Sequence, residues 1–94
     1  MKVVNDLNDL LSVLTTQIFV DILVDKMGQY DPNDESWVAI GFDGLDEIEF
    51  IMEVEKRCDC HIYDEFADRM YREISPKMIY KLLMRDRNLN TLGI

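Results

Sequence analysis

The sequence has few basic residues and no long hydrophobic run. Ten Lys and Arg stand against 19 Asp and Glu, so the net charge is −9. Nucleic acids and anionic membrane surfaces select basic patches, and this balance argues against both as partners. No apolar run approaches the roughly 20 residues that span a bilayer, and residues 1–14 lack the basic start and apolar stretch of a signal peptide. We therefore expect a cytoplasmic monomer with no membrane span and with a basic protein partner.

Cysteine and histidine are scarce, and both occur in one segment, Cys58-Asp59-Cys60-His61. Adjacent ligands make poor tetrahedral geometry, and there is no second Cys/His pair to complete a zinc site. Cys58 is better explained as a small buried hydrophobe, and the two cysteines as reduced thiols. A calcium loop beginning at Asp31 would need glycine and glutamate where Ser36 and Phe42 stand. The sequence therefore predicts no metal site.

Catalytic groups are equally sparse. His61 is the only histidine, and a catalytic triad would need a nucleophile and an orienting acid beside it. Ser12, Ser36 and Ser75 stand in ordinary loop or cap contexts. The carboxylates lie on a helix face that we expect to be solvated, where a carboxylate is a poor general acid at neutral pH. We expect no catalytic residue and no enzyme activity.

What is present is enough apolar sequence for one small, all-α domain. Of the 94 residues 48% are hydrophobic, which supports a core. Residues 5–28 have helical spacing, with Asn5 or Asp6 as the cap and Gly28 as the stop. Their apolar stripe changes face partway, so we predict a helix at 15–28 and a bent or separately packed N-terminal extension at 1–14. A strand at Ile18–Val24 is the alternative, although no partner strand is visible.

The remaining segments predict a long loop followed by three helices. Residues 29–43 carry turn residues, but four apolar side chains within them should fold back on the core: Trp37, Val38, Ile40 and Phe42. Helices are predicted at 44–58 and 64–71, with a turn at 59–63. Ser75-Pro76 begins the last helix, with serine as its cap. We expect that helix to bury Met78, Ile79, Leu82 and Leu83. The predicted domain covers residues 15–86, and residues 87–94 are predicted to form a C-terminal tail.

The central stretch runs from Gly41 to Phe50 and opens an amphipathic helix. Asp43 can cap this helix, and its charge suits the positive end of the helix dipole. Apolar residues follow at helical spacing: Leu45, Ile48, Ile51, Met52 and Val54. The other side is acidic, with Asp46, Glu47, Glu49, Glu53 and Glu55. The sequence therefore predicts a short helix with a negative outer face.

Here the chain resembles the acyl carrier protein family. The family's second helix begins with Asp-Ser-Leu, and this chain has Asp43-Gly44-Leu45. The similarity continues through Glu49 and Met52 to Ile62-Tyr63-Asp64-Glu65-Phe66-Ala67, and upstream it includes Ser36-Trp37-Val38 and Ile40-Gly41. It covers roughly residues 15–83 and implies a bundle of three longer helices and one short helix. The long loop would then join the first and second helices.

The chain departs from the family at position 44. The family's serine is esterified with 4′-phosphopantetheine, and Gly44 offers no hydroxyl for that phosphoryl transfer. Glycine also costs an interior helix position roughly 0.5–1 kcal/mol against alanine, so folding does not demand it. We expect no cofactor on this chain, and 4′-phosphopantetheine only with serine at position 44. The leading hypothesis is an interaction or regulatory module that cannot be loaded.

Two other readings stay open. The chain could be a genuine carrier of fatty acid, polyketide or related thioester biosynthesis with its serine substituted, or an unrelated helical protein with a chance match. The resemblance implies that the acidic helix docks on a basic surface of a carrier-protein-recognising enzyme or another protein. The residues implied are Asp43, Leu45, Asp46, Glu49, Met52, Glu53 and Ile62. In the family such a domain encloses an acyl chain, which would place Met52 or Ile62 in the cavity lining.

Overall fold

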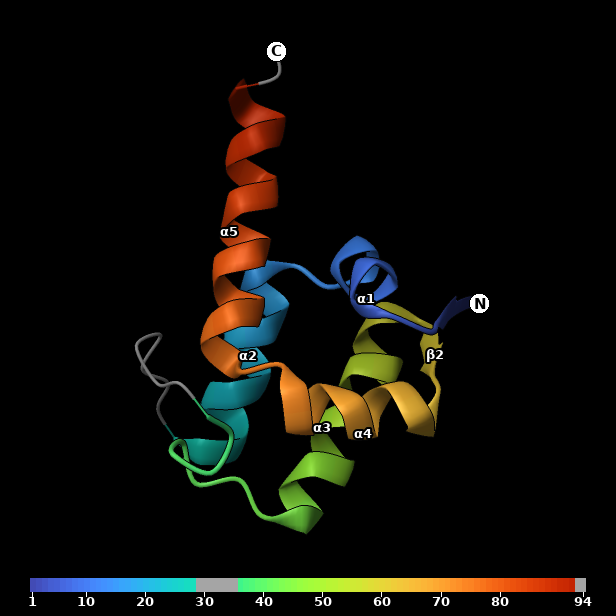
Figure 1. The fold of residues 1–94 in the computed structure, drawn as a ribbon, viewed down its shortest axis with the longest axis vertical. Coiled ribbons are helices and arrows are strands. Elements are labelled where there is room, and N and C mark those ends of the chain that lie inside the picture. The colour runs from blue at the N-terminus through green and yellow to red at the C-terminus, as the bar shows by residue number, and fades with distance from the viewer. Residues whose placement is uncertain (29–35, 93–94) are drawn as a thin grey trace.

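The computed structural model describes the backbone of residues 1–28 and 36–92 and the side chains of residues 1–28 and 36–85. Within these residues the chain is mostly helical, which confirms the all-α class in outline (Figure 1). The elements in order are β1 (Lys2–Val4), α1 (Leu7–Val13), α2 (Thr16–Met27), α3 (Gly44–Cys58), β2 (Cys60–Ile62), α4 (Asp64–Glu73) and α5 (Pro76–Leu92). The two short strands were not predicted.

Helices α1 and α2 meet at a bend of 92°, which explains why the apolar stripe changes face. Asp6 caps α1 by accepting from the Asp9 amide at 2.8 Å, and Thr15 caps α2 by accepting from the Ile18 amide at 3.1 Å. Gly28 ends α2 with a left-handed φ of 78°, which glycine adopts without a Cβ penalty. The alternative of a strand at Ile18–Val24 is wrong, because these residues lie within α2.

The N-terminal segment shares the core of the domain. Strand β1 pairs in parallel with β2, with Lys2 opposite Cys60 and Val4 opposite Ile62. The turn predicted at 59–63 is therefore largely a strand, and it follows Asp59, which ends α3 in a left-handed conformation with φ 49°. Three side chains from the N-terminal segment are buried: Val4, Leu10 and Leu14. One face of the strand pair is buried through Val4, Cys60 and Ile62, while Val3 and His61 are exposed, and α1 and α3 contact the pair.

An aromatic cluster fills the centre of the core. Phe50 of α3 lies edge-on to Phe19 of α2, with ring centres 6.0 Å apart, and lies 5.4 Å from Trp37. Trp37 and Phe42 are buried, which confirms that this part of the loop folds back on the core, and the Trp37 indole donates to the Ile74 carbonyl at 2.8 Å. Val38 instead is exposed. Residues 29–35 of the predicted loop, which include the first part of the rejected calcium loop, lie outside the described residues.

The last helix begins as predicted and ends later. The Ser75 hydroxyl accepts from the Met78 amide at 3.1 Å, and Ile79 and Leu83 are buried, whereas Met78 is exposed. Helix α5 continues past residue 86 to Leu92 and projects from the rest of the molecule (Figure 1). Most of the segment expected as a tail therefore continues the helix. Within the described residues no single helix is long and apolar enough to cross a membrane, although α1 and α2 counted together meet that criterion of length and composition.

Candidate functional site

The start of α3 is exposed and tightly capped. The Asp43 carboxylate accepts from the Asp46 amide at 2.9 Å, and the Asp46 carboxylate accepts from the Asp43 amide at 3.1 Å. The backbone bond from Asp46 holds the pKa of Asp43 below its usual range. Gly44 is the first helical residue, and a Cβ placed there would meet nothing within 4 Å. A β-carbon therefore fits at position 44 without a clash.

Three large apolar side chains on α3 are exposed, and we call them the α3 stripe: Leu45, Ile48 and Met52. Their exposed fractions are 63%, 60% and 61%. Spacings of three and four residues put them on one face of the helix. Helix α3 thus buries Phe50 and Val54 on one side and leaves an apolar row in solvent on the other. Single exposed apolar residues are ordinary on a protein surface, but an aligned row flanked by carboxylates is typical of an interaction site.

The predicted acidic residues Glu49 and Glu53 are held by cations toward α2. Lys26 forms an ion pair with Glu49, and Arg57 bridges Glu53 at 2.9 Å and Asp25 at 2.8 Å. Asp46 lines the same hollow between α2 and α3. This side of α3 is consequently a mixed-charge network rather than a uniformly negative face. Pairs at the surface of this kind each contribute little to stability, typically about 0–1 kcal/mol.

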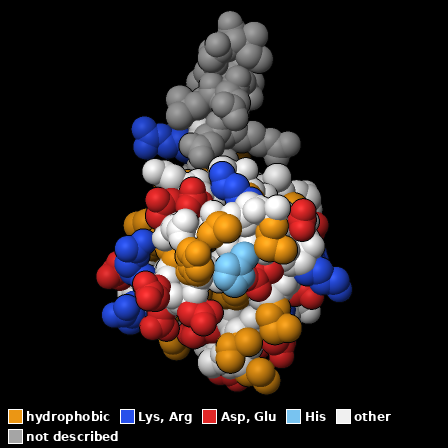
Figure 2. Space-filling model, turned by 90° about the vertical axis from the view of Figure 1, so that its right-hand side faces the viewer, with side chains coloured by type: hydrophobic (Ala, Val, Ile, Leu, Met, Phe, Trp, Pro, Cys, Tyr) orange, Lys and Arg blue, Asp and Glu red, His pale blue; other side chains and the backbone are white. Residues whose placement is uncertain are grey.

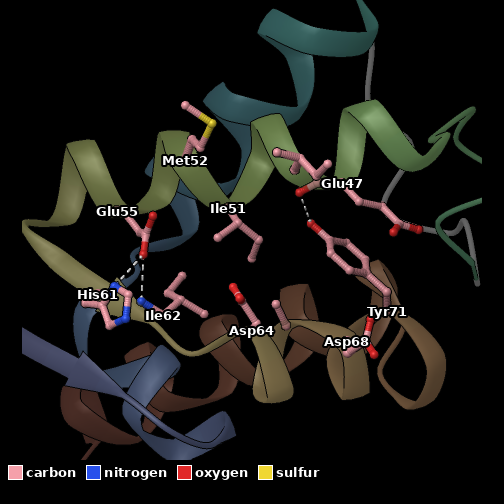
Figure 3. A pocket seen from close by; sticks show the side chains of 11 residues that line it. Glu47, Ile51, Met52, Glu55, His61, Ile62, Asp64, Asp68 and Tyr71 are labelled. Carbon is pink, nitrogen blue, oxygen red and sulfur yellow. Dashed lines mark hydrogen bonds and ion pairs between the residues drawn. The ribbon is translucent and has the colours of Figure 1, made fainter.

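The opposite side of α3 borders a cavity of about 460 Å³, which lies between α3, β2 and α4. We call its apolar inner wall the cavity floor, formed by Ile51, Ile62 and Ala67. Ile48 and Met52 of the α3 stripe also line it. The remaining lining residues are polar: Glu47, Glu55, His61, Asp64, Asp68 and Tyr71 (Figure 3). The volume lies within the range of small-molecule sites.

Two hydrogen-bonded contacts hold the walls of this cavity together. The Glu55 carboxylate accepts from the Ile62 amide at 2.8 Å and lies 3.2 Å from the His61 imidazole, which ties α3 to β2 (Figure 3). The Tyr71 hydroxyl donates to the Glu47 carbonyl at 2.8 Å, which ties α4 to α3. Burial raises the pKa of Tyr71, so its hydroxyl stays protonated and remains a donor.

The structure separates the residues that the sequence grouped into one partner-binding face. Leu45 and Met52 lie on the α3 stripe, while Glu49 and Glu53 lie toward α2. Ile62 is buried, with 1% of its surface exposed, and belongs to the cavity floor beside Met52, as the resemblance implied for a cavity lining. Sequence reasoning did not single out Glu55, Asp64, Asp68 or Tyr71 for this site. The spacing of Asp64, Asp68 and Tyr71 on one face of α4 was the signal that could have found them.

The described residues include no group of three or more His, Cys, Asp and Glu side chains placed to hold a metal ion. Cys58 and Cys60 are free thiols. Burial raises the pKa of both, that of Cys60 to about 11, so both stay protonated at neutral pH and are poor nucleophiles.

Figure 2 shows the face of the molecule that carries the single histidine. Hydrophobic and acidic side chains are interspersed around it, with the basic side chains placed mainly toward the edges of the view. Comparisons of the chain with family models, curated proteins and solved structures give no significant match.

Proposed function

We propose that this chain is an acyl-carrier-protein-like interaction module that cannot itself carry 4′-phosphopantetheine. It docks through the α3 stripe on a basic, partly apolar surface of a carrier-protein-recognising enzyme or a similar protein. The observation that carries the proposal is the α3 stripe itself, a row of exposed apolar side chains beside the exposed Gly44. Without a side-chain oxygen at position 44 there is no nucleophile for attachment of the arm.

Charge supports a basic partner. Glu47 and Glu55 line the cavity on one side of the α3 stripe, whereas Glu49 and Glu53 on the other side are paired with Lys26 and Arg57. The net charge of −9 adds a long-range field of the same sign. Such a field raises the rate of encounter with a basic surface, while buried apolar contacts at the centre of an interface supply most of the affinity.

The order and lengths of the helices also support the proposal. Helices α2, α3 and α5 are the longer ones, α4 is shorter, and the long connection falls between α2 and α3. This is the order that the resemblance implies. The resemblance extends from Trp37 to Ala67, and the buried residues of this segment, including Phe50 and Phe66, belong to one continuous core.

The docking test uses a broad-specificity carrier-protein transferase as the binding probe. Leu45→Ser combined with Met52→Ser removes two apolar contacts and should weaken binding about tenfold or more, the size typical of central interface residues. Val38→Ser is the matched control, because Val38 is also an exposed apolar residue but lies outside α3. Surface plasmon resonance at two salt concentrations measures the affinity and the salt dependence of the association rate, which reports electrostatic steering. An equal loss of affinity in the control and in the double variant would show that the docking surface does not lie on α3.

A genuine carrier with its attachment serine substituted is the second candidate, favoured by the open space at Gly44. The protein as written should stay unmodified with coenzyme A, magnesium and the transferase. Gly44→Ser should gain about 340 Da by mass spectrometry, because its hydroxyl can attack the coenzyme A pyrophosphate. Failure of Gly44→Ser to react would favour a dedicated non-carrier role. A gain on the parent chain would refute both readings and point to another hydroxyl, such as Ser36.

A further inference from the structure

The cavity between α3, β2 and α4 has a one-sided charge that its apolar floor does not explain. Its lining includes carboxylates from both helices, and we call these the cavity carboxylates: Glu47, Glu55, Asp64 and Asp68. Neither lysine nor arginine is among the described residues that line it. A site built only for a neutral hydrocarbon gains nothing from carboxylates at its rim, since each must stay hydrated or paired.

The cavity carboxylates differ in how they are engaged. Glu55 already accepts from the Ile62 amide and pairs with His61. For Asp64 and Asp68, by contrast, no ion pair to a lysine or arginine is present among the described side chains. Figure 3 shows the Asp64 carboxylate pointing from α4 toward α3, next to the cavity floor. An anionic group held beside an apolar wall is placed to bind a cation that carries an apolar stem.

We propose that this cavity binds a primary ammonium group on an aliphatic chain. The ammonium lies between Asp64 and Asp68, and the chain lies along the cavity floor toward Met52. An ammonium supplies three donors to the carboxylate acceptors, and its chain removes the floor from water. A fatty acid anion of the same length is repelled by the cavity carboxylates. The site goes beyond the proposed function, and its proposal can fail while the docking of α3 stands.

The test is a titration of the isotope-labelled chain, followed by amide chemical shifts, with three ligands of equal chain length: octylammonium, octanol and octanoate. Octylammonium should shift the amides of Ile51, Ile62 and Ala67 saturably and bind at least about tenfold more tightly than octanoate, because several charge contacts change sign. The affinity for octanol should lie between the affinities for octylammonium and octanoate. Octanoate binding as tightly as octylammonium, or no saturable shift at the cavity floor with octylammonium, would overturn the proposal.

Two pairs of substitutions on the same helix separate local charge from net charge. Asp64→Asn with Asp68→Asn should weaken octylammonium binding about fivefold, the size expected for two solvent-exposed charge pairs. Glu65→Gln with Glu73→Gln is the matched control, because both residues are exposed on α4 and neither lines the cavity. Each pair removes two negative charges, and each includes one residue of the first helical turn. Equal weakening by both pairs would overturn the assignment of the site.

A last titration identifies the source of the ammonium group. N-acetyl-lysine methylamide presents the same group on the short stem of a protein side chain. Tighter binding of octylammonium identifies a free amphiphilic amine as the ligand, because its longer chain covers more of the cavity floor. Binding of the lysine derivative at equal or higher affinity identifies a lysine side chain of a bound protein. Absence of binding by both compounds contradicts the proposal.

Discussion

The ionisation of Asp43 is tied to the fold, because this residue caps the helix that carries the α3 stripe. The Asp46 amide holds its pKa below the ordinary value of 3.8. A depressed folded-state pKa gives stability that is fully present above the unfolded-state pKa and is lost as the pH falls through the folded-state pKa. Parent stability should therefore decline in acid in part through Asp43.

Asp43→Asn keeps a side-chain oxygen for the cap and removes the titrating group. We expect the variant to be less stable than the parent near neutral pH, with the difference shrinking as the pH falls below the unfolded-state pKa. Urea unfolding at a series of pH values measures this. A difference that stays constant across the series would mean that the ionised cap contributes nothing to α3.

Local side-chain chemistry made several single residues predictable. Asp43 and Ser75 were correctly expected as caps, because a cap depends only on its own residue and the next three. The burial of Ile62 against the cavity was expected only through the resemblance. The bond from Tyr71 to the Glu47 carbonyl joins residues on different helices, and the sequence pattern of either helix alone carries no sign of it.

At the scale of elements, the N-terminal segment is part of the core. Leu10 of α1 is 1% exposed, so Leu10→Ala removes buried methyl groups and leaves a cavity. We expect a loss of about 2–5 kcal/mol in the free energy of unfolding, measured by urea titration. Asn8→Ala on the exposed side of the same helix is the control and should change stability by less than about 0.5 kcal/mol. A small loss for Leu10→Ala would instead mean that the segment packs separately.

The helices were predictable and the strands were not. Helices 44–58 and 15–28 agree closely with α3 and α2, because their apolar residues recur at the helical period over many turns. Each strand has three residues, which is too short for a period-two pattern to appear. Their pairing joins residues 2–4 to residues 60–62, which are far apart in the sequence. The mixed-charge network on α3 was missed for a similar reason, since Lys26 and Asp25 come from another helix.

At the scale of the whole molecule, the net charge of −9 opposes compaction. Sodium chloride screens this repulsion, with a screening length of about 10 Å at 0.1 M. We expect the free energy of unfolding to rise between low salt and about 0.15 M salt. The rise should be smaller for Glu65→Gln with Glu73→Gln, whose net charge is −7 because each substitution removes one negative charge from −9. Unfolding monitored by circular dichroism measures both.

The local ion pairs would produce the opposite trend. Screening weakens Lys26–Glu49 and the two bonds of Arg57. Stability that falls with added salt would therefore show that these pairs outweigh the general repulsion. The control pair of substitutions would then leave the size of the fall unchanged, because Glu65 and Glu73 take no part in the network.

The register of β1 on β2 has a consequence for how the chain folds during synthesis. The ribosome releases the N-terminus first, but Val4 finds its strand partner only in Ile62. Until then the first strand has no neighbour and presents an open edge. Closing so long a loop is entropically costly and slow compared with forming a helix. Val4 therefore lacks its strand partner until Ile62 has been synthesised, and this is the period when a holding chaperone would protect the unpaired strand from aggregation.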